Sequence, residues 1–179
     1  MSQAIYPFAT TTDWIKVKEV SLQTNTYPLS VTGLNLRADL AYFVIAYIGN
    51  SHTQYSRDID VVFNGDTNTS NYTKRAMIFE ADTVTSYVSS SVHVTYIGPG
   101  KFTTIYLYIA IQDGYVTANV LPCASIVGVT SPPITWMATL YHNTATNLTG
   151  LQFYIGINAN SLTNLLAGSK ALVFKPRLG

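Results

Sequence analysis

Short segments in which apolar and polar residues alternate recur along this chain of 179 residues, and turn-forming residues separate them. The segment Phe102 to Ile111 shows the pattern most clearly, with Ile105, Leu107 and Ile109 at alternate positions. Successive side chains of a β-strand point to opposite faces, so this period of two is typical of strands. No segment keeps a helical period over three turns. The pattern predicts an all-β fold, a single-domain antiparallel β-sandwich of jelly-roll type.

The expected strands cover residues 14–22, 29–36, 42–48, 58–63, 74–80, 84–96, 102–111, 134–141, 151–157 and 171–174. Residues 42–48 are rich in β-branched and aromatic side chains without interruption, which predicts a strand that is buried on both faces. Residues 116–129 are apolar, but Pro122 and Gly128 interrupt them. Residues 161–167 fit either one helical turn or a loop.

The length suits one domain, which we expect to span residues 13–179. Residues 1–12 are apolar but irregular, and they predict an N-terminal arm that lies on a neighbouring molecule. Charged residues make up only 11% of the chain, and the formal net charge is +1. Copies with so little charge repel one another weakly, which favours self-assembly. The few basic residues are scattered, so nucleic acid is not an expected partner.

Cysteine content and hydropathy exclude further classes. Cys123 is the single cysteine, which excludes an intrachain disulfide and a cysteine-built zinc site; we expect it to be a small buried apolar group. No apolar run approaches the roughly 20 residues of a membrane span. Residues 1–18 show no basic segment followed by an apolar one, so we expect no secretory signal.

The strongest local signal is a turn. It comprises Phe63, Asn64, Gly65 and Asp66, followed at a short distance by Asn71 and Tyr72. Asn and Gly tolerate positive φ, which a tight turn requires, and Asp66 is expected to cap the turn by accepting hydrogen bonds from backbone amides.

Phe63-Asn64-Gly65-Asp66-Thr67 followed by Asn71-Tyr72 resembles a motif of tailed-phage virion proteins found among tail and head-fibre components. Residues 167–174 resemble the closing strand of the same group, although Val173-Phe174 replaces its usual Tyr-Gly. The resemblance implies a capsid, tail or fibre protein located in the virion. The resemblance does not imply a particular receptor. The partners expected for this chain are copies of itself, as a trimer or pentamer, other virion proteins, and a host-surface glycan if it contributes to attachment.

Other chemistries have weaker support. His52, His93 and His142 lie on separate segments, and His93 occupies a polar, exposed position of its predicted strand, so we assign no catalytic residue and expect no enzyme. Asp58, Asp60 and Asp66 are a possible calcium set, but their spacing matches no calcium loop. We therefore assign no metal and no cofactor. A carbohydrate-binding module is the alternative function, since Tyr55, Tyr87 and Tyr115 are candidate aromatic contacts near strand ends.

Overall fold

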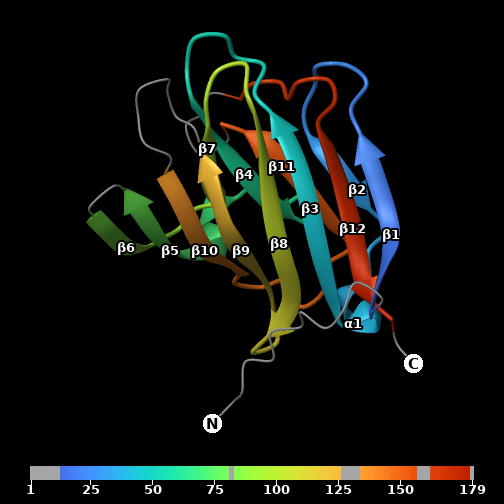
Figure 1. Ribbon diagram of the computed structural model, residues 1–179. Coiled ribbons are helices and arrows are strands. Elements are labelled where there is room, and N and C mark those ends of the chain that lie inside the picture. Colours follow the sequence, from blue (N-terminus) through green and yellow to red (C-terminus); the bar gives the residue numbers. More distant parts are fainter. Residues whose placement is uncertain (1–12, 81–82, 126–133, 157–161, 178–179) are drawn as a thin grey trace.

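The computed structural model describes residues 13–80, 83–125, 134–156 and 162–177. In this part of the chain two antiparallel β-sheets pack face to face (Figure 1), which confirms the predicted all-β sandwich. The predicted N-terminal arm, residues 1–12, lies outside the described residues. No helix among the described residues is long and apolar enough to cross a membrane.

The larger sheet has eight strands among the described residues, in the order β1-β12-β3-β8-β9-β10-β5-β6. Their bounds are β1 (Trp14–Ser21), β12 (Lys170–Pro176), β3 (Ala41–Gly49), β8 (Phe102–Gln112), β9 (Tyr115–Ser125), β10 (Ile134–His142), β5 (Tyr72–Glu80) and β6 (Thr83–Ser89). The smaller sheet has the order β2-β11-β4-β7, with β2 (Leu29–Thr32), β11 (Gly150–Ile155), β4 (Arg57–Phe63) and β7 (His93–Ile97).

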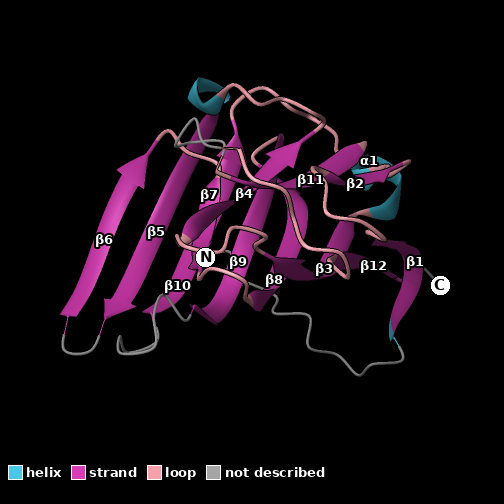
Figure 2. Cartoon of the chain, turned by 90° about the horizontal axis from the view of Figure 1, so that it is seen from above, coloured by secondary structure: helices cyan, strands magenta, loops and turns pink. Residues whose placement is uncertain are grey.

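The chain passes between the sheets at nearly every early connection, because β1 and β3 belong to the larger sheet while β2 and β4 belong to the smaller one. This order is compatible with the predicted jelly-roll type, in which two four-stranded sheets exchange strands in this way. The strands β9, β10, β5 and β6 extend the larger sheet beyond such a core. Figure 2 shows β5 and β6 continuing past the side of the smaller sheet.

The core fills the space between the two sheets. Alternate residues of β3, such as Val44 and Ala46, are fully buried, and so are Leu151 and Phe153 of β11. The opposite side of β3 is different, because Phe43 and Ile45 are only half-buried and Tyr47 is 38% exposed. The prediction that this strand is buried on both faces is therefore wrong for the isolated chain. Its second face is apolar and has no covering layer among the described residues.

The predicted strand 84–96 is in fact two strands in different sheets. β6 pairs with β5 in the larger sheet, whereas β7 pairs with β4 in the smaller one. A period of two continues across a chain reversal, so alternation alone does not show where the chain changes sheet.

The strand expected over residues 29–36 is shorter in the structure, because β2 ends at Thr32. A short helix, α1 (Leu36–Asp39), follows it, and the Asn35 side chain caps this helix by accepting from the Ala38 amide. Residues 162–168 form a loop with isolated bridges at Thr163 and Leu165.

Candidate functional site

The turn at the end of β4 has the backbone that its sequence requires. Asn64 and Gly65 have φ values of 55° and 78°, and the Asp66 amide donates to the Phe63 carbonyl at 3.0 Å. Positive φ at both central positions defines a type I′ turn. Asp66 also caps the following residues, because its Oδ1 accepts from the Asn68 amide at 2.9 Å.

The Tyr72 side chain stabilises this turn through hydrogen bonds of its hydroxyl group. The Phe63 amide donates to the Tyr72 hydroxyl at 2.9 Å, and that hydroxyl donates to the Asp66 carbonyl at 2.8 Å. Burial raises the pKa of Tyr72 above its usual range, so the phenol stays protonated and can donate. The motif residues Phe63, Asp66 and Tyr72 thus form one hydrogen-bonded unit.

His142, which the motif does not include, completes the unit from β10. Its Nε2 lies 3.1 Å from Asp66 Oδ2, and its Nδ1 accepts from the Ala145 amide at 3.1 Å. A backbone amide can only donate, so Nε2 must carry the proton that is shared with Asp66. Asn71 donates to the same carboxylate at 2.7 Å, and this bond is the largest cause of the lowered pKa of Asp66. Asn71 and His142 both bond to Asp66, so these residues link the turn after β4 to the end of β10. We call these three residues, together with Tyr72, the brace.

A second cluster lies at the other end of β4. Asp58 and Asp60 point to the same side because they are two residues apart. An extra residue in β7, Val94, brings His93 opposite Asp60, while Tyr96 lies opposite Asp58. His93 Nδ1 is 3.5 Å from Asp58 Oδ1. His93 is only 5% exposed, so its predicted exposed position is wrong.

Lys74 of β5 brings a positive charge to this cluster. The residue is only 2% exposed, and its Nζ lies 4.9 Å from the centre of the Tyr87 ring. Burial lowers the pKa of Lys74 to about 8, against the opposing attraction of Asp58 and Asp60. Burial, assisted by Lys74, lowers the pKa of His93 to about 3, so its imidazole is neutral at pH 7. Burial also raises the pKa of Asp58.

The cluster has the composition of a metal site but also its own counter-charge. One ligand atom from each of Asp58, Asp60 and His93 lies within 4.8 Å of the others. The Lys74 ammonium already offsets the charge of the two carboxylates. A divalent cation in the same place would be repelled by this ammonium and would have to displace it. Asp66 is not part of this group, because it follows the opposite end of β4 and binds His142. The structure therefore does not bring together the three aspartates that were considered as a calcium set.

The three predicted tyrosines also lie apart. Tyr55 is exposed in the loop between β3 and β4, where the Arg57 guanidinium lies 5.4 Å from its ring. Tyr87 is half-buried over Lys74, and Tyr115 is exposed at the turn between β8 and β9. Figure 1 shows the connection from β3 to β4 and the connection from β8 to β9 at opposite ends of the sandwich, so Tyr55 and Tyr115 lie far apart.

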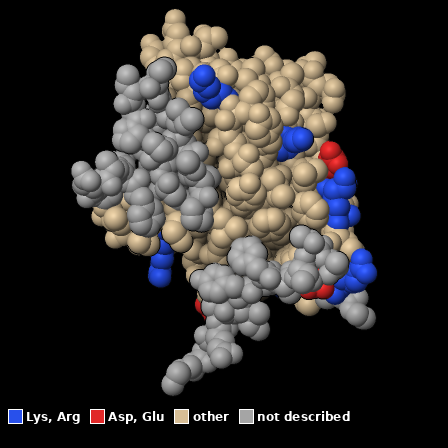
Figure 3. Space-filling model, viewed as in Figure 1, with Lys and Arg blue, Asp and Glu red and all other residues tan. Residues whose placement is uncertain are grey.

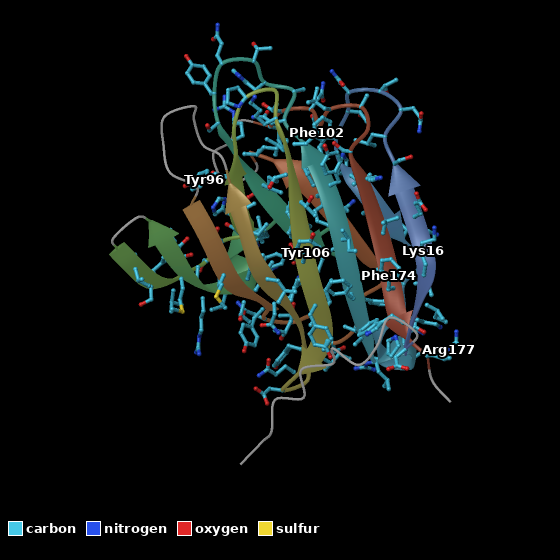
Figure 4. All side chains as sticks on the ribbon, viewed as in Figure 1. Lys16, Tyr96, Phe102, Tyr106, Phe174 and Arg177 are labelled. Atoms are coloured by element: carbon cyan, nitrogen blue, oxygen red, sulfur yellow. The ribbon has the colours of Figure 1, made fainter. Side chains whose placement is uncertain are left out.

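A different set of aromatic residues gathers on the outer side of the larger sheet. We call it the aromatic face, and it comprises Trp14, Phe43, Tyr47, Phe102, Tyr106 and Tyr108. Trp14 lies 6.1 Å from Phe43 and 6.5 Å from Tyr108, Phe43 stacks on Tyr106 at 6.3 Å, and Tyr47 stacks on Phe102 at 4.6 Å between ring centres. Figure 4 places Phe102 near one end of β8, Tyr106 at its middle, and Phe174 across β3 on β12.

Gly49 makes room for part of this arrangement. It lies directly opposite Phe102 in the β3–β8 pair, and a Cβ atom built on it would lie 2.5 Å from the Phe102 ring. The missing side chain thus lets the ring lie over the backbone, where it meets Tyr47. Alternation of aromatic residues in β3 and β8 was the signal that could have revealed the face from sequence.

The aromatic face is also poor in charge. The four adjacent strands β3, β8, β9 and β10 contain no Lys, Arg, Asp or Glu. Figure 3 shows several Lys and Arg side chains toward the β1 and β12 side of this face and others at its upper and lower margins, whereas the middle of the face, over β8, shows no charged residue. Antiparallel sheets with one solvated face usually alternate apolar and polar residues. Here the outward side carries aromatic rings instead.

Comparisons with known proteins give little guidance. No family model matches the chain, and no curated protein matches it. Among solved structures, Trypanosoma rangeli sialidase is similar at 10% sequence identity and a TM-score of 0.26, over 95% of this chain and 32% of that chain. This chain thus corresponds to about a third of the length of the sialidase, and a likeness at this TM-score carries no argument about fold or activity.

Proposed function

We propose that this protein is a structural component of a virus particle, in its capsid, tail or fibre, and that it assembles with copies of itself through the aromatic face. Two features besides that face support the proposal. The strand order is compatible with the jelly roll, an architecture of viral capsid and lectin domains. The turn from Phe63 to Tyr72 resembles that of tailed-phage virion proteins.

The aromatic face is the observation that carries the proposal. Large contiguous apolar surfaces on a soluble protein mark sites of contact, and aromatic residues are enriched where two proteins meet. Tyr47 and Tyr106 are 38% and 36% exposed, so each ring still has surface to bury. A second copy is the favoured occupant because four strands without charge oppose no like charge when two such faces meet.

Sedimentation velocity over a range of concentrations tests this assembly. The wild-type protein should form a discrete oligomer. Contact between two aromatic faces gives a two-fold dimer, whereas the trimer or pentamer expected from the sequence requires the face to contact a different surface of the next copy. Tyr106→Glu should weaken association about ten-fold or more, because it places a charge in the middle of the face. Tyr115→Glu is the matched control, since Tyr115 is similarly exposed at a turn outside the face. A wild-type protein that stays monomeric at high concentration would contradict the assembly.

The virion role needs a test on the particle. Antibodies against the purified protein should label intact particles at regular positions in electron micrographs. Labelling that is confined to infected cells, with none on purified particles, would contradict a structural role even if the protein oligomerises.

A carbohydrate-binding module is the second candidate, and the stacked pair Tyr47 and Phe102 favours it. The two rings are nearly parallel, with 8° between their planes, and such flat aromatic surface suits sugar rings. A glycan array probed with the monomeric Tyr106→Glu variant would separate the candidates. Selective glycan binding that is lost in Tyr47→Ser, together with a monomeric wild type, would favour this second function.

A further inference from the structure

The two edges of the larger sheet differ in how they are protected. β1 forms one edge and carries Lys16, Lys18 and Glu19. It also contains a β-bulge, because Val17 is an extra residue between Lys16, opposite Phe174, and Lys18, opposite Val173. Charged side chains and bulges are the usual means by which natural proteins prevent an edge strand from pairing with another chain.

β6 forms the other edge and has neither protection. Its seven residues, Thr-Val-Thr-Ser-Tyr-Val-Ser, include no charge and no proline, and several favour β-structure. The register with β5 is continuous from Thr83 to Ser89, without a bulge. Val84 and Val88 are 62% and 67% exposed. Within the described ranges β6 pairs with β5 alone, so its second side carries unpaired backbone groups.

The sequence of β6 is also nearly symmetric about Ser86. We propose that β6 pairs antiparallel with β6 of a second copy, about a two-fold axis at Ser86, and so joins the two larger sheets into one. In this register Val84 lies opposite Val88 of the other copy, and Ser86 lies opposite its own counterpart. Each Val–Val pair would bury two exposed side chains, and such pairs stabilise neighbouring strands.

The neighbouring outer surface is consistent with this occupant. Met77 of β5 lies opposite both Ser86 of β6 and Met137 of β10, and both methionines are 42% exposed. Two-fold pairing would place Met77 and Met137 of each copy on either side of the boundary between the two β6 strands, which we call the seam. Among the described residues, Arg75 of β5 is the outward charge nearest to β6, and it lies opposite Val88. β6 itself carries no charged residue. A two-fold contact between identical strands needs no other partner.

This inference deepens the proposed function, because it rests on self-assembly and names a second, isologous contact. Cysteine cross-linking tests it directly. Residues opposite each other in an antiparallel pair lie within disulfide reach, so Ser86→Cys, made in a Cys123→Ser background, should give a covalent dimer under mild oxidation. Val17→Cys on the β1 edge is the matched control and should stay monomeric on a denaturing gel.

Charge substitutions test the register. Val84→Lys combined with Val88→Lys should weaken the dimer about ten-fold or more, since lysines would face each other twice across the seam. Val84→Lys combined with Val88→Glu should restore it, because antiparallel pairing places each lysine opposite a glutamate. Parallel pairing would instead oppose like charges. Both valines are exposed, so circular dichroism should show both double variants folded.

The outcomes separate this inference from the proposed function. If no cross-link forms in Ser86→Cys, or if the double-lysine variant associates as strongly as the wild type, the proposed β6 pairing is wrong. If Tyr106→Glu still abolishes assembly in that case, the aromatic-face contact stands by itself. A Ser86→Cys cross-link with rescue by the Lys/Glu variant supports the pairing, whether or not Tyr106→Glu affects assembly.

Discussion

The two ends of β4 each hold a histidine beside an aspartate, and the two pairs behave in opposite ways. At the end of the strand, His142 bonds Asp66 at 3.1 Å, and hydrogen bonds lower the pKa of Asp66, that from Asn71 most of all. At the start, His93 lies 3.5 Å from Asp58, and burial raises the pKa of Asp58. The same two residue types therefore give a satisfied brace in one place and a desolvated charge cluster in the other.

The difference comes from the groups that stabilise each carboxylate. Asp66 is bonded mainly by groups close in sequence, the Asn68 amide and the Asn71 side chain. Asp58 instead depends on Lys74 and Arg57, and Lys74 comes from the other sheet. Local hydrogen bonds stabilise a carboxylate at small cost, whereas buried charges must first lose their hydration. The first pair is held by local hydrogen bonds, and we expect the second to be sensitive to substitution and to pH.

The largest expected effect comes from removing the counter-charge at the start of β4. Lys74→Ala should lower the free energy of unfolding by about 3–5 kcal/mol, because it leaves buried carboxylates without their ammonium. Urea denaturation at pH 7 measures the change. Lys16→Ala, which breaks the exposed ion pair with Glu19, is the control and should have a much smaller effect. Equal losses in the two variants would show that the cluster is hydrated.

The pH dependence of stability tests His93 next. The pKa of His93 is about 3 in the folded protein, below its ordinary value of 6.5, so the unfolded chain binds the proton first as the pH falls. Stability should therefore decrease from about pH 6.5 downward. His93→Gln should remove on the order of 3 kcal/mol of this loss between pH 7 and pH 4.

Urea midpoints along a pH series measure this difference. The groups that act on His93 are Asp58, Asp60, Tyr96 and Lys74, and all stay in place in the variant. Thr95→Val on the same strand is the control and should keep the wild-type pH slope. A His93→Gln protein with an unchanged slope would mean that His93 is solvated.

The brace at the end of β4 is tested through its turn. Gly65→Val should cost roughly 1–3 kcal/mol, because a β-branched residue is strained at a φ of 78°. Steric crowding is not the cause, since the nearest atom to an added Cβ, Gln152 Oε1, is 3.6 Å away. Gly65→Asn should lose much less, because Asn tolerates positive φ. Thermal unfolding compares the two, and an unchanged melting temperature in Gly65→Val would contradict the turn.

The smallest effect concerns Thr95, beside the charge cluster on β7. Its Oγ1 is buried and forms no hydrogen bond with the residues the structure describes. Thr95→Val keeps the shape and removes the hydroxyl, so it should raise stability by up to about 1 kcal/mol. A comparable loss, measured by urea denaturation, would reveal a bound water as the missing partner.

Sequence reasoning was most successful where the determining interactions are local. The period of two located most strands, and Asn64-Gly65 predicted the turn, because both follow from the φ and ψ preferences of a few neighbouring residues. It also predicted that Asp66 would accept backbone amides. The same reasoning joined β6 to β7, because alternation continues where the chain leaves one sheet for the other.

By itself, then, the sequence determined most of the strands, the turn at Gly65 and the scarcity of charge. Only the tertiary structure decided which side chains share an environment. It buried His93 and Lys74 around Asp58, separated Tyr55 from Tyr115, and aligned Phe43 with Tyr106 on one face. Those juxtapositions join residues far apart in the chain, so they depend on strand order and register, which short-range preferences do not specify.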